Sequence, residues 1–283
     1  MTIPEQSVLD AFGLTGRAVP LAGGQGLSVR VGDAVLKPAE RDSEIVDWTA
    51  EILDTIHEQG FRVARPIRNA DGAWSHGGWT ASRYVVGEEP DHAVAPRWSE
   101  IIDAGRAFHR ALAGLPRPGF LDRRANWWET GNKVAWQERK PHLPSALQGP
   151  YEDLVGLLGP PPRERSQLIH GDLTGNVLFA PGLAPAVIDF SPYWRPAAFG
   201  EAVVVGDALI WHGADTGLLT RATRDGGPDF VQYVVRAIVF RLVTTGERLR
   251  DQHTEVGSGT LAEVHQYEHV ARLVADFAGT GPG

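Results

Sequence analysis

Residues 168–190 read LIHGDLTGNVLFAPGLAPAVIDF, and this stretch decides the fold. It contains two short apolar runs, at residues 177–179 and 186–188, with a proline-glycine pair at residues 181–182 between them. Short apolar runs joined by such a turn are typical of paired strands. The stretch therefore predicts a hairpin whose open end brings together the residues just before the first strand and just after the second.

Three polar residues flank this predicted hairpin. Asp172 and Asn176 emerge from the turn before the first strand, and Asp189 follows the second strand. In phosphoryl transfer, a carboxylate orients the acceptor hydroxyl, while an amide and a second carboxylate bind magnesium. The ordinary alternative is that Asp172 and Asn176 shape the turn through side-chain to backbone hydrogen bonds, and that Asp189 caps the next turn. The hairpin context favours the chemical interpretation.

A glycine-rich loop near the N-terminus is the second candidate element. Residues 23–28 read GGQGLS, and short apolar runs follow at residues 29–31 and 34–36. Glycines let backbone N–H groups approach phosphate oxygens closely, although a plain tight turn would have the same composition. The P-loop pattern is absent, and no helix follows the loop. We expect a strand-loop-strand cover over phosphates, in a hairpin ending at Lys37. Its candidate contacts are Gly23, Gly24, Gln25, Gly26 and Ser28.

Lys37 is unusual because the chain has only three lysines, the others being Lys133 and Lys140. A lysine at the end of a strand beside phosphates supplies positive charge, and a glutamate on a neighbouring helix would fix its position. Apolar periodicity predicts that helix from Asp42 or Ser43 to Gly60. Its candidate glutamates are Glu44 and Glu51, and helical phase does not choose between them. A surface lysine is the ordinary alternative.

The remaining pattern predicts an α+β chain with two lobes. Residues 1–87 show strand-like runs, glycine turns and one helix, whereas residues 88–283 show helical periodicity. A formal charge of −8 argues against a nucleic-acid or anionic-membrane surface, and the chain has no cysteine for disulfides or thiolate sites. No apolar run is long enough to span a membrane, and we expect a cytoplasmic location.

Taken in this order, these clusters resemble the aminoglycoside phosphotransferase and choline kinase group of the kinase-like superfamily, from about residue 21 to residue 209. The triplet at residues 170–172, with Asn176, resembles the catalytic loop of that group, and residues 188–190 resemble its metal-binding segment. The resemblance implies a bilobal kinase-like fold with a small, mainly β, N-lobe for nucleotide phosphates. The larger helical C-lobe would carry the catalytic loop and bind metal and acceptor.

The same resemblance assigns roles to individual residues. It implies Asp172 as the catalytic base, Asn176 and Asp189 as Mg²⁺ ligands, and Lys37 as a phosphate ligand partnered by Glu44 or Glu51. His170 and Asp207 would support the catalytic loop, Asp207 from a helix. Purine would be received by a hinge in the segment WTASRYVVGEE, at Ser82, Tyr84 and Val85. The implied cofactors are ATP or GTP and Mg²⁺.

One departure from the group concerns the length of the catalytic loop. The asparagine normally follows the base by five residues, and here Asn176 follows Asp172 by four. Either Gly175 tightens the turn and metal binding is retained, or the ligand geometry is lost and activity is weakened. We favour the first alternative, because Asp172, Asp189, Lys37 and the glycine loop are all present.

A cluster of tryptophans supplies a candidate acceptor pocket. Trp127, Trp128 and Trp136 lie close together in sequence beside Glu129, and aromatic faces with carboxylates bind sugars and cationic amines. In the resembling enzymes this region of the helical lobe helps to form the acceptor site. Helix packing explains tryptophans at least as often.

The sequence thus predicts a magnesium-dependent phosphotransferase that moves the γ-phosphate to a hydroxyl of a small molecule such as an amino sugar, aminoglycoside or amino alcohol. The alternative is a catalytically weak or inactive kinase-like protein that binds nucleotide or metabolite. A zinc site is not expected among the ten histidines, because no ligand cluster or HExxH pair occurs. His109 fits a packed, hydrogen-bonded residue better than a ligand. Neither the acceptor nor the oligomeric state follows from the sequence.

Overall fold

The structure is a computed structural model, and it describes residues 3–21, 26–94, 96–227, 229–252 and 258–279. The chain forms two compact units. The first contains Met1–Glu89, Arg110–Leu112 and Asn176–Phe190, and the second contains Pro90–His109, Ala113–Gly175 and Ser191–Gly283. The division predicted from sequence assigned residues 176–190 to the C-terminal part, whereas their strands pair within the first unit.

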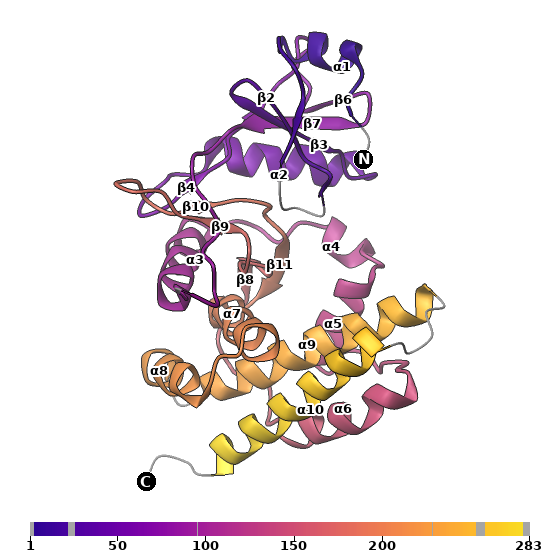
Figure 1. Ribbon diagram of the computed structural model, residues 1–283, viewed down its shortest axis with the longest axis vertical. Helices are drawn as coiled ribbons and strands as arrows, with labels where there is room; N and C mark the ends of the chain where they lie inside the picture. Colours follow the sequence, from indigo (N-terminus) through magenta and orange to yellow (C-terminus); the bar gives the residue numbers. More distant parts are fainter. Residues whose placement is uncertain (1–2, 22–25, 95, 228, 253–257, 280–283) are drawn as a thin grey trace. The chain divides into compact units, whose positions relative to one another are not determined.

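An antiparallel sheet organises the first unit (Figure 1). Its hydrogen-bonded order is β1-β2-β3-β7-β5, and β6 also pairs with β7. The predicted hairpin ending near Lys37 is confirmed, because β2 and β3 pair antiparallel across a turn in which Gly32 has a φ of 57°. The strands are β1 (Val19–Pro20), β2 (Val29–Val31), β3 (Ala34–Pro38), β5 (Pro66–Ile67), β6 (Ser75–His76) and β7 (Trp79–Arg83).

Two helices pack with this sheet, one more than the sequence predicted. The additional helix α1 (Gln6–Ala11) is too short for a periodic signal, and its Val8 and Leu9 join a core with residues of β2, β3 and β7. The predicted helix is α2 (Ser43–Thr55), which begins after the N-cap Asp42 and ends before Gly60. Its Val46 and Ala50 are buried in a second small core.

The decisive stretch forms the predicted hairpin. Strands β9 (Val177–Leu178) and β10 (Ala186–Val187) pair antiparallel, with Val177 opposite Val187. On its other edge β10 pairs in parallel with β4 (Arg62–Val63). The hairpin is therefore the centre of a small sheet within the first unit, and its open end carries Asn176 and Asp189.

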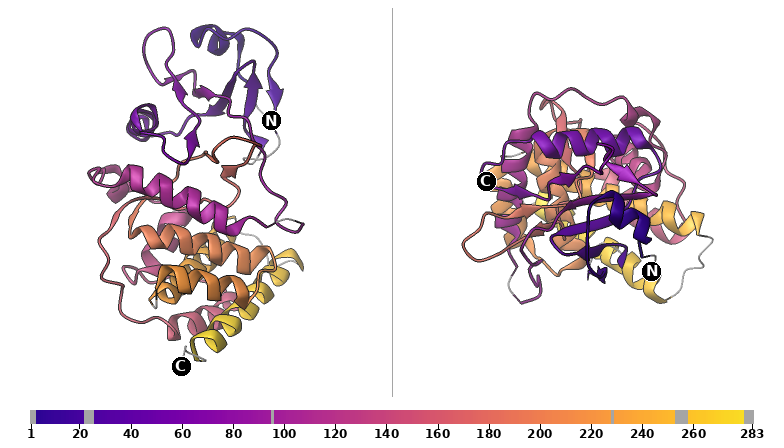
Figure 2. Two further views of the ribbon diagram at one scale, coloured as in Figure 1. Left: turned by 90° about the vertical axis from the view of Figure 1, so that its left-hand side faces the viewer. Right: turned by 90° about the horizontal axis from the view of Figure 1, so that it is seen from above.

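Helices dominate the second unit, and α9 is its centre, since α9 packs against α5, α6, α7, α8 and α10. Figures 1 and 2 show these helices as a bundle from three directions. A two-stranded ladder of β8 (Gln167–His170) and β11 (Pro192–Arg195) packs against α7. The helices are α3 (Trp98–Leu112), α4 (Phe120–Arg123), α5 (Trp127–Ala135), α6 (Ser145–Gly156), α7 (Ala197–Trp211), α8 (Thr216–Gly226), α9 (Phe230–Asp251) and α10 (Ser258–Gly279).

Helices α7 and α9 are buried on most sides, which explains their nearly continuous apolar sequences. Five charged residues interrupt them inside the core, namely Glu201 and Asp207 on α7 and Arg236, Arg241 and Glu247 on α9. A buried charge requires hydrogen-bonding partners, so these residues point to specific interactions. Among the helices that the structure describes, none has the length and apolar character needed to cross a membrane.

Candidate active site

The predicted site residues divide between the two compact units, and each group is built by its own unit. Lys37, Asn176 and Asp189 belong to the first unit, whereas His170, Asp172 and Asp207 belong to the second. The chain passes from the second unit to the first between Gly175 and Asn176, and returns between Phe190 and Ser191. One loop therefore contributes to both groups.

In the first unit, the Lys37 ammonium forms an ion pair with the Asp189 carboxylate. Lys37 lies on β3 opposite Thr80 of β7, and Asp189 follows β10 with a left-handed φ of 51°. Both side chains are partly exposed, at 32% and 37%. The fold thus brings the single lysine of this sheet to the open end of the hairpin.

This pairing corrects the prediction for Glu51. Its carboxylate accepts hydrogen bonds from the Trp74 indole at 3.1 Å and the Arg68 guanidinium at 2.8 Å, and these bonds lower the pKa of Glu51. Glu51 therefore pairs with Arg68 and Trp74, whereas Lys37 pairs with Asp189. Glu44 lies in the first turn of α2, where its backbone N–H donates to Asp42 at 3.0 Å. Its role beside Lys37 stays a prediction.

The open end of the hairpin has suitable donors for magnesium. The Ile188 N–H donates to the Asn176 carbonyl at 3.0 Å, which holds Asn176 directly across from the residue before Asp189. Asn176 and Asp189 offer amide and carboxylate oxygens, the donors that Mg²⁺ prefers. No group of three or more histidine, cysteine, aspartate or glutamate residues able to hold a metal occurs in the described ranges.

Two further predicted segments of the first unit are only partly described. Gly23, Gly24 and Gln25 lie outside the described residues. Gly26 has a φ of 68°, and the Ser28 carbonyl accepts from the Leu21 N–H at 3.0 Å, which closes the base of the loop.

The predicted hinge follows directly from the sheet. Ser82 lies in β7 between Val35 and Pro66 of the neighbouring strands. Tyr84 follows β7, its N–H donates to the Asp33 carbonyl at 2.8 Å, and the Arg30 guanidinium lies 3.6 Å from the centre of its ring. Val85 follows Tyr84 and is partly buried. Their contact with a purine stays a prediction.

In the second unit, two buried histidines hold the predicted catalytic loop. The His170 N–H donates to Nε2 of His109 at 2.9 Å, and the Asp172 N–H donates to Nδ1 of His170 at 3.1 Å. Both ring nitrogens act as acceptors, so both histidines are neutral in this arrangement. Burial is the main reason that the pKa of His109 is lowered to about 3, and His170 lowers it further. His109 is thus a packed, hydrogen-bonded residue, as the sequence predicted.

The Asp172 carboxylate is held by a residue that sequence reasoning missed. The Arg241 guanidinium donates from Nη2 to Oδ1 of Asp172 at 2.6 Å. It also donates to both carboxylate oxygens of Asp207, each at 2.7 Å. Burial alone would lower the pKa of Arg241, but Asp207 and Asp172 together raise it. Asp207 therefore reaches the catalytic loop through Arg241.

A sequence signal for Arg241 existed. It lies in the run IVFRLV of a helix that is otherwise apolar there, and the spacing predicts that it faces the core. Arginine is almost never fully buried without a partner. The side chain of Asp172, by contrast, is 42% exposed, so this carboxylate is both anchored and accessible.

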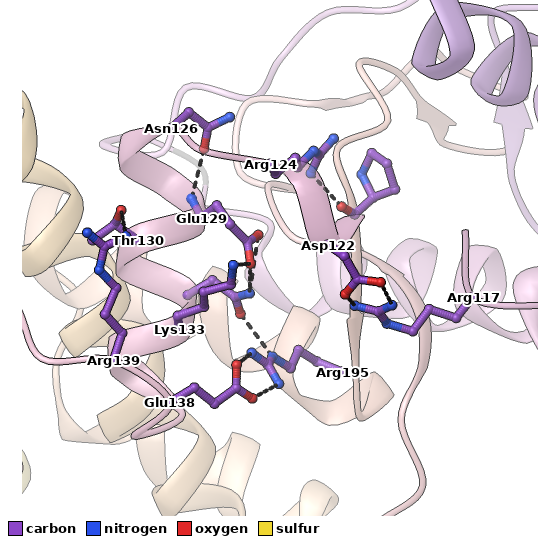
Figure 3. A network of polar contacts seen from close by, with 12 residues as sticks. Arg117, Asp122, Arg124, Asn126, Glu129, Thr130, Lys133, Glu138, Arg139 and Arg195 are labelled. Carbon is purple, nitrogen blue, oxygen red and sulfur yellow. Dashed lines mark hydrogen bonds and ion pairs between the residues drawn. The ribbon is translucent and has the colours of Figure 1, made fainter. Parts of the chain in front are cut away.

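The predicted acceptor region is a network of paired charges, shown in Figure 3. Arg117 binds Asp122 through two contacts of 2.7 and 2.9 Å, and Arg195 binds Glu138 at the same two distances. Glu129 is buried and has only longer contacts, to Asn132 and Lys133. Burial raises the pKa of Glu129, and Lys133 opposes this effect. Among these carboxylates Glu129 is held least tightly.

The tryptophans of this region have different environments. Trp136 is only 9% exposed and packs edge-on against Phe199, with the guanidinium groups of Arg195 and Arg236 near its ring. It is therefore a core residue, which corrects its prediction as an acceptor contact. Trp127 and Trp128 lie with ring centres 5.7 Å apart, and Trp128 is 38% exposed. This pair remains available as an aromatic surface.

Solved structures with the same fold include several phosphotransferases. An aminoglycoside phosphotransferase from Alicyclobacillus acidocaldarius subsp. acidocaldarius aligns with a TM-score of 0.64 at 18% identity, covering 99% of this chain and 96% of the other. A spectinomycin phosphotransferase in complex with ADP and spectinomycin aligns with a TM-score of 0.58 at 13% identity, covering 95% and 96%. A choline kinase from Streptococcus pneumoniae aligns at 0.58 and 10% identity, covering 96% and 99%. These likenesses confirm the predicted kinase-like α+β fold.

A comparison with curated protein sequences finds no match. A family comparison does find one, because residues 18–193 match the phosphotransferase enzyme family. The matched range covers more than half of the chain and includes Lys37, Asp172, Asn176 and Asp189. It confirms the group that the sequence motifs indicated and the prediction of a phosphotransferase. The chain therefore belongs to the phosphotransferase enzyme family.

Proposed function

We propose that this phosphotransferase moves the γ-phosphate of a nucleoside triphosphate, ATP or GTP, to a hydroxyl group of a small molecule, with Mg²⁺ as cofactor. The observation that carries the proposal is the accessible Asp172 carboxylate, held by Arg241 on a loop that the family match includes. Neighbours of the same fold were solved with ADP or with AMP-PNP, which supports nucleotide binding.

In the second unit, Asp172 would act on the acceptor. Its carboxylate orients the attacking hydroxyl in line with the phosphorus and accepts the proton as the new P–O bond forms and the bond to the leaving diphosphate breaks. The hydrogen bond from its own N–H to His170 and the bond from Arg241 restrain both ends of this residue. Positioning of this kind supplies much of the rate in phosphoryl transfer.

In the first unit, Lys37, Asn176 and Asp189 would hold the phosphates and the metal. When bound, Mg²⁺ would neutralise charge on the phosphate oxygens. The Lys37 ammonium adds a second positive charge, and its ion pair with Asp189 keeps both groups at the open end of the hairpin. Gly175, with a φ of 78°, adopts the left-handed backbone that a tightened loop before Asn176 requires, which supports retention of Asn176 as a ligand.

The acceptor class is proposed from charge and from fold neighbours together. The neighbours include enzymes named for aminoglycosides and for choline, which are cationic compounds that carry hydroxyl groups. In this chain, Asp122 and Glu138 are already paired with arginines, so Glu129 is the carboxylate best able to exchange its longer contacts for an amine. An amino sugar, aminoglycoside or amino alcohol is therefore the proposed acceptor class, with Trp127 and Trp128 as aromatic contacts.

The test is magnesium-dependent phosphate transfer to a panel of amino sugars, aminoglycosides, amino alcohols and nucleosides. The variant Asp172→Asn should lose on the order of 10²–10⁴-fold in kcat, the usual contribution of a general base, while nucleotide binding and the melting temperature stay close to wild type. The matched control is Asp153→Asn, which changes an exposed aspartate on α6 and should retain full turnover. Near wild-type turnover by the Asp172 variant would refute the role of Asp172.

The alternative is a kinase-like protein that binds nucleotide or metabolite without transfer. Binding of ATP or GTP with no magnesium-dependent transfer or hydrolysis across the whole panel would support that alternative. Equal rates with and without Mg²⁺ would instead contradict the assignment of Asn176 and Asp189. A cytoplasmic location remains a prediction from composition.

A further inference from the structure

Arg241 is a buried cation on α9 that contacts two carboxylates of different kinds. Its side chain is only 7% exposed. Asp207, on α7, is fully enclosed at 2% side-chain exposure, whereas Asp172 is 42% exposed. One positive charge thus lies between a buried negative charge and an accessible one. If the cluster only stabilised the core, Asp207 alone would be enough to neutralise the buried Arg241 guanidinium.

The geometry of the three hydrogen bonds gives the two carboxylates different roles. Asp207 accepts from both Nε and Nη2 of Arg241, and such a two-point contact fixes the plane of a guanidinium. The remaining bond runs from the same Nη2 to Oδ1 of Asp172. With Oδ1 held, the Asp172 carboxylate cannot rotate about its Cβ–Cγ bond without breaking this contact.

We propose that Arg241 is a positioning residue for phosphate transfer, and that it orients the Asp172 carboxylate while Asp207 fixes the orientation of Arg241. This inference rests on the proposed role of Asp172 as the catalytic base. Arg241 does not touch the acceptor or the phosphates in this scheme. Its contribution passes entirely through Asp172.

The aromatic and histidine side chains that face the cluster are neutral. Tyr193 of β11 and Tyr267 of α10 face the cluster, and burial raises the pKa of both phenols, so they stay neutral. His170 faces the loop as a neutral acceptor of the Asp172 N–H. On α9 and α7, the rings of Phe240 and Trp211 lie near the Arg241 guanidinium and bring no formal charge. Removing Arg241 should therefore remove the ion pair that holds Oδ1 of Asp172.

The decisive variant is the double substitution Asp207→Asn with Arg241→Met. It removes the buried ion pair as a whole, so no uncompensated charge remains in the core, whereas Arg241→Met alone would leave Asp207 unpaired. We expect the double variant to fold, with a circular dichroism spectrum like that of wild type. Its kcat should fall on the order of 100-fold, the usual effect of misplacing a reacting group by about 1 Å. The KM for nucleotide should change less than about twofold, because the phosphate-binding residues are untouched.

Two readouts separate positioning from general stability. The first is additivity: in an Asp172→Asn background the double variant should lower kcat no further, because a residue that acts only through Asp172 has nothing left to position. The second is the variant Arg241→Lys, which keeps the charge but loses the two-point contact, so it should recover only part of kcat. A purely structural residue would lower the melting temperature and would lower kcat by the same factor in both backgrounds.

The outcomes distinguish this inference from the proposed function. If Asp172→Asn is inactive but the folded double variant has wild-type kcat, the positioning role is overturned and the base assignment survives. A double variant that does not fold also overturns it, because the cluster would then be needed for the core itself. If Asp172→Asn turns over like wild type, the proposed function fails first. The inference is supported if kcat falls in the double variant, if this loss is absent in the Asp172→Asn background, and if Arg241→Lys recovers part of kcat.

Discussion

Gly171, the residue before Asp172, has no room for a side chain, and replacing it by alanine is a sharp test of the catalytic loop. A Cβ atom at this position would lie 2.3 Å from Cδ2 and 2.6 Å from Cε2 of Tyr193. The Tyr193 ring is buried and packs against Phe240 with ring centres 5.8 Å apart, so it cannot simply turn away. The Gly171 backbone is tied as well, since its N–H donates to the Ser191 carbonyl at 3.0 Å.

The expected size of the effect follows from these distances. Ordinary van der Waals contact for a Cβ begins at 3.4 Å, so the loop and the ring must separate by about 1 Å. Overpacking of this kind costs about 1–3 kcal/mol of unfolding free energy. For a chain of this size, that corresponds to a decrease of roughly 2–12 °C in melting temperature. A shift of about 1 Å next to Asp172 should also lower kcat on the order of 100-fold.

The assay compares Gly171→Ala with Gly156→Ala. Gly156 is an exposed residue in the last turn of α6, and a Cβ there would meet nothing within 4 Å. The control should therefore gain up to about 1 kcal/mol from helix propensity and keep its turnover. Thermal unfolding followed by circular dichroism gives the stability, and steady-state transfer to the best acceptor of the panel gives kcat. A Gly171 variant with wild-type melting temperature and kcat would show that the loop does not depend on this close packing.

Two further predictions concern buried titratable residues. Replacing Glu129 by Gln should raise the KM for cationic acceptors on the order of tenfold, because a hydrogen bond to a charged group contributes about 1.5–3 kcal/mol. The KM for neutral acceptors and for nucleotide should not change. An equal rise for neutral acceptors would contradict a charge-specific contact. Folding lowers the pKa of His109 from 6.5 to about 3. Between pH 6.5 and pH 3 the unfolded chain therefore binds a proton at His109 that the folded chain does not bind. The free energy of unfolding should fall with decreasing pH by about 1.4 kcal/mol per pH unit. Urea unfolding between pH 4.5 and 7 should show this dependence reduced in His109→Gln, and an unchanged slope would contradict it.

The features that sequence predicted well are local. The pairing of Val177 with Val187 follows from two short apolar runs and the turn between them, and the pairing of β2 with β3 follows from the same kind of pattern. The start of α2 at Asp42 follows from its N-cap, where the side chain accepts the Glu44 N–H. These choices depend on neighbours within a few residues, so the sequence alone contains the information.

The partner of Lys37 was not predictable in that way. Helical phase placed Glu44 and Glu51 at similar positions on α2, but phase says nothing about which cations lie nearby. Arg68, from the loop after β5, reaches Glu51 and also stacks on Trp74, which donates to the same carboxylate. Lys37 pairs with Asp189, which is 152 residues away in sequence. The choice is made by the sheet and the hairpin together, and a pattern of single residues does not encode it.

On helix α9 too, the sequence predicts that a buried charge has a partner but does not identify the partner. Arg236 and Arg241 both interrupt an apolar run, and the sequence predicts for each that a buried cation needs acceptors. Arg236 finds them in the carbonyls of Ala135 and Gly159, at or just beyond the C-terminal ends of α5 and α6, where the helix dipole favours positive charge. Arg241 finds carboxylates instead, one of them the proposed base. Two arginines in similar apolar runs thus bind different acceptors, because these acceptors come from other elements. A buried arginine is therefore a reliable signal that a partner exists, and only the fold determines whether that partner is structural or catalytic.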